Sequence, residues 1–180
     1  MYKRIFVAID NSSTARKALE EAIVLTRALG ANLCIATALD EGPLSQHGMG
    51  LGTYIDIDRV KQQMRESSDA LLDQALAQAA AAGCVAERCL IESTQRRVAE
   101  MISEAANGWG ADLIVIGTHG RRGFQRLLVG SVAENLVRIA TVALMLVREN
   151  RPRGVVCEPC TRTNRRLNPG QSRPRGRAGR

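Results

Sequence analysis

The residues with the clearest chemical potential lie in one glycine-rich segment in the second half of the chain. Gly117, Gly120, Gly130 and Ser131 have the spacing Gly-x2-Gly-x9-Gly-Ser. Glycine lets a backbone approach a ligand where any Cβ would clash. The residues after Ser131 have a helical pattern, and the start of a helix presents unpaired N–H groups and a partial positive charge to anions. The spacing therefore predicts a phosphate site in which Gly130 and Ser131 hold the phosphate.

Three cations, Arg121, Arg122 and Arg126, add positive charge to the same segment. The segment differs from a Walker loop, because Gly-x4-Gly-Lys-Ser/Thr does not occur and no lysine lies within it. It also differs from the dinucleotide fingerprint, because the turn after the first predicted strand, Asp10-Asn-Ser-Ser, has no glycine. Two common phosphate-binding motifs are thereby excluded.

Simpler structural roles compete for some of these residues. Ser131 and Glu134 have the Ser-x-x-Glu spacing of a helix capping box, which is compatible with phosphate binding. Asp10 follows the first predicted strand, where it would cap the first helix or stabilise its turn instead of contacting a ligand. His119 has the chemistry of a general base, but the sequence places no carboxylate or nucleophile beside it. We therefore expect a solvated or phosphate-adjacent His119 and predict no catalytic residue.

Short apolar runs alternate with amphipathic helical patterns around this segment. The expected strands are Arg4–Ile9, Leu33–Leu39, Val85–Ile91, Leu113–Ile116 and Val142–Val147. The expected helices are 15–29 ended by Gly30, 60–79 ended near Gly83, 98–109 stopped by Gly108 and Gly110, and 132–139. Strict alternation predicts an α/β fold: an open, five-stranded, mostly parallel sheet with helices on both faces. Ligands of such sheets bind beyond the carboxyl ends of the strands, where Asp10 and Ala38 stand.

Composition and charge divide the chain into a body and a tail. The chain has 180 residues, of which 45% are apolar and only 3% aromatic, so one domain with an aliphatic core is expected. Residues 1–150 hold 16 basic and 17 acidic residues, whereas residues 151–180 hold nine arginines and one glutamate. We predict a folded domain over 1–148 and a disordered Arg/Pro/Gly-rich tail over 149–180. Only the tail offers nonspecific contact to nucleic acid, because the body is nearly neutral.

The cysteines and the apolar runs bear on location. The chain has five cysteines, an odd number, and strand-like sequence follows Met1 at once, so we expect reduced thiols and a cytoplasmic location. Cys34 lies in an apolar run and is predicted to be buried. Cys157 and Cys160 form an isolated Cys-x-x-Cys without a second ligand pair, so no metal site is predicted. No apolar stretch approaches the ~20 residues of a membrane span.

The glycine spacing resembles the nucleotide-binding pattern Gly-x2-Gly-x9-Gly-Ser/Thr of ATP-binding universal stress proteins. Residues 117, 120, 130 and 131 meet that pattern without a gap. The run Val-Ala-Ile-Asp-Asn-Ser over 7–12 resembles the family's first strand and turn, with Asn11 where glycine is common. Residues 111–123 also resemble the family closely. The likeness covers roughly residues 2–148 and implies a Rossmann-like, adenine nucleotide alpha hydrolase-like fold.

On the adenosine side, the resemblance implies that Asp10 contacts the ribose hydroxyls or the adenine edge. The backbone near Ala38 would meet the adenine, while Gly117 and Gly120 would line the ribose and phosphates. The ligand so implied is ATP, with or without Mg²⁺.

On the phosphate side, the resemblance implies that Gly130 and Ser131 hold oxygens and that Val132 supplies a further backbone N–H. Arg121 would add charge beside them. Any hydrolysis would be slow, since the Walker lysine is missing, and the implied role is regulation in a stress response.

Two departures from the family concern Thr37, which stands where histidine is frequent, and the run Thr-Val-Ala-Leu over 141–144, which replaces a Pro-Val-Pro type run. The resemblance implies a homodimer through the last strand, and an apolar edge strand favours such pairing. The missing prolines would loosen that strand.

Three other functions stay open. The first is a stress protein that does not bind nucleotide and acts through protein–protein contacts. The second is a nucleotide-using enzyme on the same scaffold, which would need a second domain or substrate pocket for which the chain has no room. The third is a nucleic-acid-binding protein acting through the tail.

Overall fold

A computed structural model describes residues 1–40, 56–93, 96–119 and 130–148. Several predictions concern residues outside these ranges and remain predictions. They include Gly120, the arginines at 121, 122 and 126, and the tail over 149–180.

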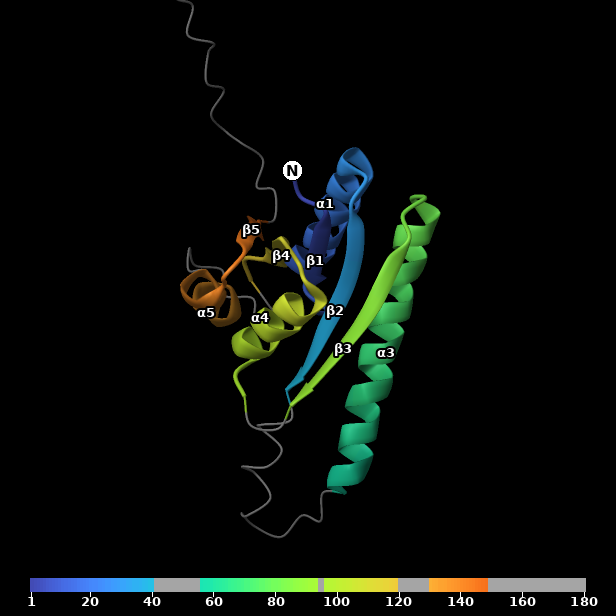
Figure 1. The fold of residues 1–180 in the computed structure, drawn as a ribbon. Helices are drawn as coiled ribbons and strands as arrows, with labels where there is room; N and C mark the ends of the chain where they lie inside the picture. Colours follow the sequence, from blue (N-terminus) through green and yellow to red (C-terminus); the bar gives the residue numbers. More distant parts are fainter. Residues whose placement is uncertain (41–55, 94–95, 120–129, 149–180) are drawn as a thin grey trace, which may run out of the picture. The chain divides into compact units, whose positions relative to one another are not determined.

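Five strands and four helices alternate along the described residues, as predicted (Figure 1). The strands are β1 (Arg4–Ala8), β2 (Asn32–Asp40), β3 (Ala86–Ser93), β4 (Leu113–Gly117) and β5 (Ala143–Val147). The helices are α1 (Ser13–Leu29), α3 (Ile57–Ala81), α4 (Val98–Trp109) and α5 (Ser131–Ile139). Every neighbouring pair of strands is parallel, in the order β3-β2-β1-β4-β5. The predicted α/β fold class is confirmed.

Glycines end three of the helical segments in the way the sequence indicates, with one correction. Gly30 and Gly110 close α1 and α4 in the left-handed conformation, with φ of 61° and 76°. Gly83, after α3, has φ of 72°. The prediction that Gly108 stops α4 is wrong, because the helix continues through it to Trp109. A glycine inside a helix costs only about 1 kcal/mol, which the packing of α4 on the sheet outweighs.

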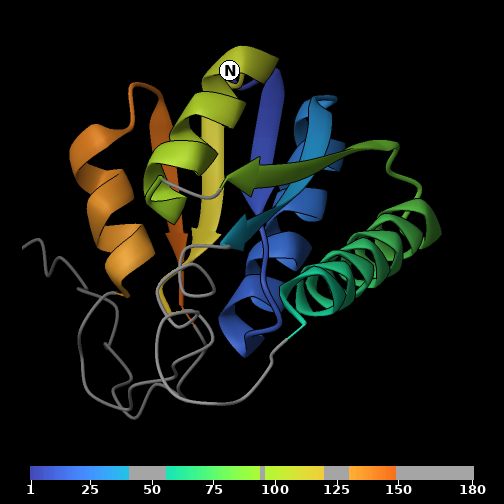
Figure 2. The same ribbon diagram turned by 90° about the horizontal axis from the view of Figure 1, so that it is seen from below.

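Helices lie on both faces of the sheet (Figure 2). A hydrophobic core lies between the sheet and the helices on each face. Side chains alternate along β1, so that Ile5 and Val7 join the core with α1 and α3, whereas Phe6 joins the core with α4 and α5. The central strands are thus buried on both faces, and the residues of β4 are all buried. Burial on both faces explains why the strands appear in the sequence as continuous apolar runs.

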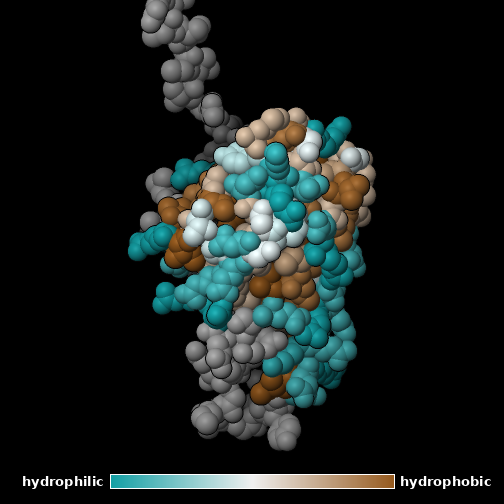
Figure 3. All heavy atoms as spheres, in the orientation of Figure 1, coloured by the Kyte–Doolittle hydropathy of each residue, from teal (hydrophilic) through white to brown (hydrophobic). Residues whose placement is uncertain are grey.

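The two edges of the sheet carry different side chains. At the β3 edge, Arg88 forms ion pairs with Asp69 and Asp73 of α3, and Glu87 accepts a hydrogen bond from Trp109 Nε1 at 3.0 Å. At the β5 edge, Leu144, Met145 and Leu146 are only half-buried, although all three are apolar. Figure 3 shows apolar side chains over α5 and β5, and hydrophilic ones over α3. Among the described helices, none has the length and apolar character needed to cross a membrane.

Candidate functional site

The carboxyl ends of β1 and β4 lie side by side and lead to the starts of α1 and α5. The strands pair from Ile5 with Leu113 to Ala8 with Ile116. Beyond β4, the Thr118 N–H donates to the Val147 carbonyl at 2.8 Å, and the Gly130 N–H donates to the Thr118 carbonyl at 2.7 Å. The start of α5 is therefore tied to the carboxyl end of the sheet, where α1 also starts.

The start of α1 is stabilised by its own side chains. Ser12 is the N-cap, and its Oγ accepts a hydrogen bond from the Ala15 N–H at 3.1 Å. Asp10 Oδ1 accepts from the Ser12 N–H at 3.0 Å and from the Ser12 hydroxyl. The structural role weighed for Asp10, stabilisation of the turn, is therefore present. The same contacts hold its carboxylate at the carboxyl end of β1.

Gly117 is required by packing. A Cβ at this position would lie 2.7 Å from Thr14 Oγ1 and 2.8 Å from the Thr14 carbonyl carbon. Because the backbone of α1 approaches β4 so closely, any side chain at 117 would displace the helix. Thr14 also donates a hydrogen bond to the His119 carbonyl, which joins the start of α1 to the chain after β4. The predicted contact of Gly117 with a ligand stays a prediction beside this packing role.

Thr37 and Ala38 place the end of β2 beside the end of β1. The Thr37 hydroxyl donates to the Ile9 carbonyl at 3.0 Å, and the Ile9 N–H donates to the Ala36 carbonyl at 2.8 Å. These bonds extend the pairing of the two strands to the residue before Asp10. Ala38 follows directly and is half-buried on the side covered by α4.

The start of α5 differs from the predicted capping box. Gly130 is the N-cap, with φ of −61° and ψ of 152°, and among the described residues no side-chain hydrogen bond caps the helix. Ser131 is the first helical residue and is exposed, and the Glu134 carboxylate pairs with Arg138 at 2.8 Å. The capping-box prediction is wrong because the helix begins one residue earlier than the box requires. This shift places Glu134 in the fourth helical position.

The first turn of α5 has the properties of an anion site. The first N–H groups of any helix lack intrahelical acceptors and carry partial positive charge. The Gly130 N–H is directed to the Thr118 carbonyl, so the N–H donors left for a ligand at this helix start include those of Ser131 and Val132. Val132 is half-buried against the core.

His119 and the threonines complete the described part of the site. The His119 Nδ1 atom lies 3.0 Å from the Thr118 hydroxyl. No group of three or more His, Cys, Asp or Glu side chains within the described ranges could hold a metal ion. Thr14 and Thr118 were missed by the sequence reasoning, and Thr37 was noted only as a departure from the family; the three side chains are 4%, 1% and 1% exposed, in the order Thr14, Thr118 and Thr37. Polar residues within or beside buried apolar runs were the available signal for them.

The structure thus brings together most of the predicted site at the carboxyl end of the sheet. Asp10, Ala38 and Gly117 lie at or just beyond the ends of three neighbouring strands, and Gly130, Ser131 and Val132 form the start of α5. Gly120 and Arg121 lie outside the described residues.

Comparison with known proteins agrees with this arrangement. The family model of the universal stress protein family matches residues 1–148. The crystal structure of a protein of that family from Burkholderia pseudomallei is 32% identical, with a TM-score of 0.64 over 81% of this chain and 95% of that chain.

Two further solved structures contain adenine nucleotides. A universal stress protein in complex with cAMP is 25% identical, with a TM-score of 0.59 over 81% of this chain and 97% of that chain. The universal stress protein from Archaeoglobus fulgidus in complex with dAMP is 23% identical, a likeness of fold alone, with a TM-score of 0.56 over 81% and 98% of the two chains. The match over residues 1–148, together with the 32% identity to the Burkholderia pseudomallei protein, shows that this chain belongs to the universal stress protein family.

Proposed function

We propose that this chain binds ATP at the carboxyl edge of β1, β2 and β4, and acts as a cytoplasmic regulatory protein of the stress response. The observation that carries the proposal is the start of α5, whose N-cap residue Gly130 has no side chain and which is tied to the end of the sheet where Asp10 stands. An anionic ligand would supply what α1 obtains from Ser12.

The phosphates of ATP would lie at the first turn of α5. Ser131 would contribute its hydroxyl and N–H, Val132 a further N–H, and Gly130 the space for a phosphate oxygen. Gly120 and Arg121, which lie outside the described residues, would add the remaining backbone and charge contacts, with or without Mg²⁺. Hydrolysis would be slow at most, because the segment lacks the lysine of a Walker loop.

The adenosine would lie across the ends of β1 and β2. Asp10 is an acceptor for ribose hydroxyls or for the amino group of adenine, and Ser12 already holds its carboxylate in place. Ala38 would offer backbone groups to the base. The relatives solved with cAMP and with dAMP support an adenine nucleotide as the ligand class.

The proposal includes a homodimer through β5. This strand ends the sheet, its central Leu144, Met145 and Leu146 are half-buried, and Val137 and Ile139 of α5 are 59% and 39% exposed. An apolar edge strand favours pairing with a second copy, whereas the ion pairs of the β3 edge disfavour it. Sedimentation equilibrium should give the dimer mass, and a pure monomer at micromolar concentration would refute this part.

Titration calorimetry with ATP and Mg²⁺ tests the nucleotide site through Ser131→Asp. A carboxylate in the first turn suits the helix itself, so the thermal stability of the variant should be unchanged or higher. The same carboxylate would repel a phosphate, and a repulsion of ~1.4 kcal/mol already weakens binding tenfold. We therefore expect at least a roughly tenfold loss of ATP affinity.

The charge-matched control is Ser67→Asp, on the exposed side of α3. It should bind ATP as the wild type does. The proposal fails if the wild type shows no affinity, or if Ser131→Asp and Ser67→Asp bind equally well.

A further inference from the structure

Two cysteines lie on neighbouring strands on the side of the sheet covered by α4. Cys34 of β2 stands opposite Glu87, and Cys89 of β3 stands opposite Ala36, so the two cysteines are diagonal neighbours. Both belong to the same hydrophobic core, Cys34 as a buried member and Cys89 as a partly buried one. The proposed nucleotide site uses neither residue.

The two sulfur atoms interact directly. A hydrogen bond from the Cys34 thiol lowers the pKa of Cys89 to about 7, against the opposing effect of burial. The same contact with Cys89, followed by burial, raises the pKa of Cys34. The pair is thus divided between a thiol that holds its proton more tightly and a thiol that loses its proton more easily than an ordinary cysteine.

Access to the pair is also unequal. Cys34 is 2% exposed, whereas Cys89 is half-buried on β3, the outermost strand. Ile91, two residues further along the same side of β3, lines an open pocket of about 460 Å³ together with Met101 and Ala105 of α4. This pocket opens on the side of the sheet that carries Cys89, although Cys89 itself does not line it.

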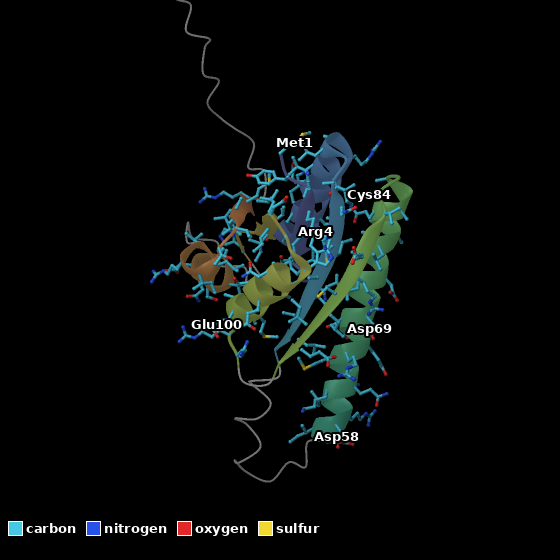
Figure 4. The ribbon with its side chains drawn as sticks, viewed as in Figure 1. Met1, Arg4, Asp58, Asp69, Cys84 and Glu100 are labelled. Carbon is cyan, nitrogen blue, oxygen red and sulfur yellow. The ribbon has the colours of Figure 1, made fainter. Side chains whose placement is uncertain are left out.

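A third cysteine shows what the pairing changes. Cys84 precedes β3, as labelled in Figure 4, and is 5% exposed. Burial raises the pKa of its thiol, and the Arg27 charge opposes that effect only in part. A thiolate is the nucleophilic form of cysteine, so Cys84 should be inert at a pH at which Cys89 reacts.

We propose that Cys89 is a modification site for hydroperoxides, with Cys34 as the hydrogen-bond donor that keeps it reactive. The Cys89 thiolate attacks one peroxide oxygen, so that an S–O bond forms and the O–O bond breaks. The second oxygen leaves as alkoxide or hydroxide and takes up a proton from water. Sulfur is oxidised by two electrons to the sulfenic acid, and the peroxide is reduced.

The test exposes the folded full-length chain to hydrogen peroxide at pH 7 with dimedone, which traps sulfenic acids, followed by peptide mass mapping. The background is the triple variant Cys84→Ser, Cys157→Ser, Cys160→Ser, which leaves Cys34 and Cys89 as the only thiols. We expect a dimedone adduct at Cys89 and none in the added variant Cys89→Ser. The inference is wrong if Cys89 stays reduced, or if Cys34 is labelled instead.

Two substitutions at Cys34 separate its role as donor from its role as core residue. Cys34→Ser keeps a hydroxyl donor and should react nearly as fast as the background. Cys34→Ala removes the donor, which returns the pKa of Cys89 toward 9 and leaves about fifty-fold less thiolate at pH 7. Each thiolate is then more nucleophilic, so the net loss of rate should be about five- to eight-fold.

Circular dichroism should show both variants folded. Equal rates in Cys34→Ala and Cys34→Ser would show that the Cys34 donor has no effect, and would overturn the assignment of Cys34.

Discussion

The starts of α1 and α5 lie at the same carboxyl end of the sheet but are built in opposite ways. At α1, Ser12 caps the helix and Asp10 accepts two hydrogen bonds from Ser12, so the turn is satisfied from within the chain. At α5, Gly130 provides no side chain and Ser131 forms no cap. The difference teaches that the helix start whose turn is satisfied by its own residues, at α1, has a structural role. The helix start whose N-cap is a glycine, at α5, is the candidate for a ligand.

Among the substitutions that test this comparison, Gly117→Ala should have the largest effect on stability. The added methyl group would overlap the backbone of Thr14 and push α1 away from β4. We expect a loss of about 3 kcal/mol in the free energy of unfolding, as for other overpacked cores. Urea unfolding followed by circular dichroism measures it. As a control, Gly108→Ala adds the same methyl group inside α4, where nothing lies within 4 Å, and should stabilise the protein slightly.

If Gly117→Ala proved as stable as the wild type, α1 would not be held against β4 as described. The need for glycine at 117 would then rest on the ligand alone.

Ser12→Ala tests the self-capped helix start. It removes the N-cap and one donor to Asp10, so the free energy of unfolding should fall by about 1 kcal/mol. Thermal unfolding monitored by circular dichroism detects a change of this size. Ser67→Ala, an exposed helical serine, should change stability by less than about 0.5 kcal/mol. Equal effects of the two substitutions would contradict the capping role of Ser12.

Ser131→Ala should have the smallest effect on stability, within about 0.5 kcal/mol, because no cap is lost. ATP affinity should nevertheless fall several-fold, since a hydroxyl contact to phosphate is worth about 1 kcal/mol. Urea unfolding and calorimetry on the same preparation separate the two quantities. A stability loss equal to that of Ser12→Ala would mean that Ser131 caps α5 in solution.

Much of the fold follows from sequence periodicity, whereas the details of the site do not. The alternation of apolar runs and amphipathic patterns predicts every described strand and helix, because burial of the sheet imposes it. The start of α5 is instead held by the hydrogen bond from the Gly130 N–H to the Thr118 carbonyl. These two residues lie far apart in the sequence, so a local sequence pattern cannot predict their contact. The capping-box prediction was wrong for this reason.

Contacts between side chains on neighbouring strands could not be predicted from the sequence either. Thr37 meets the Ile9 carbonyl, and Cys34 meets Cys89, only because of the register of β2 with its two neighbours. A sequence gives residue types and local spacing, and register depends on the whole sheet. The sequence predicts a ligand contact for Gly117, which stays a prediction, whereas its contact with Thr14 required the structure.

Hydrogen exchange with and without ATP tests the central claim most directly, because it reports both binding and its position. The account predicts that saturating ATP slows exchange of the backbone amides of Ser131 and Val132 and leaves the β3 edge unchanged. The start of α1, already capped, should gain less protection than the start of α5. Unchanged exchange at α5 in the presence of saturating ATP, or protection confined to other parts of the chain, would contradict the account.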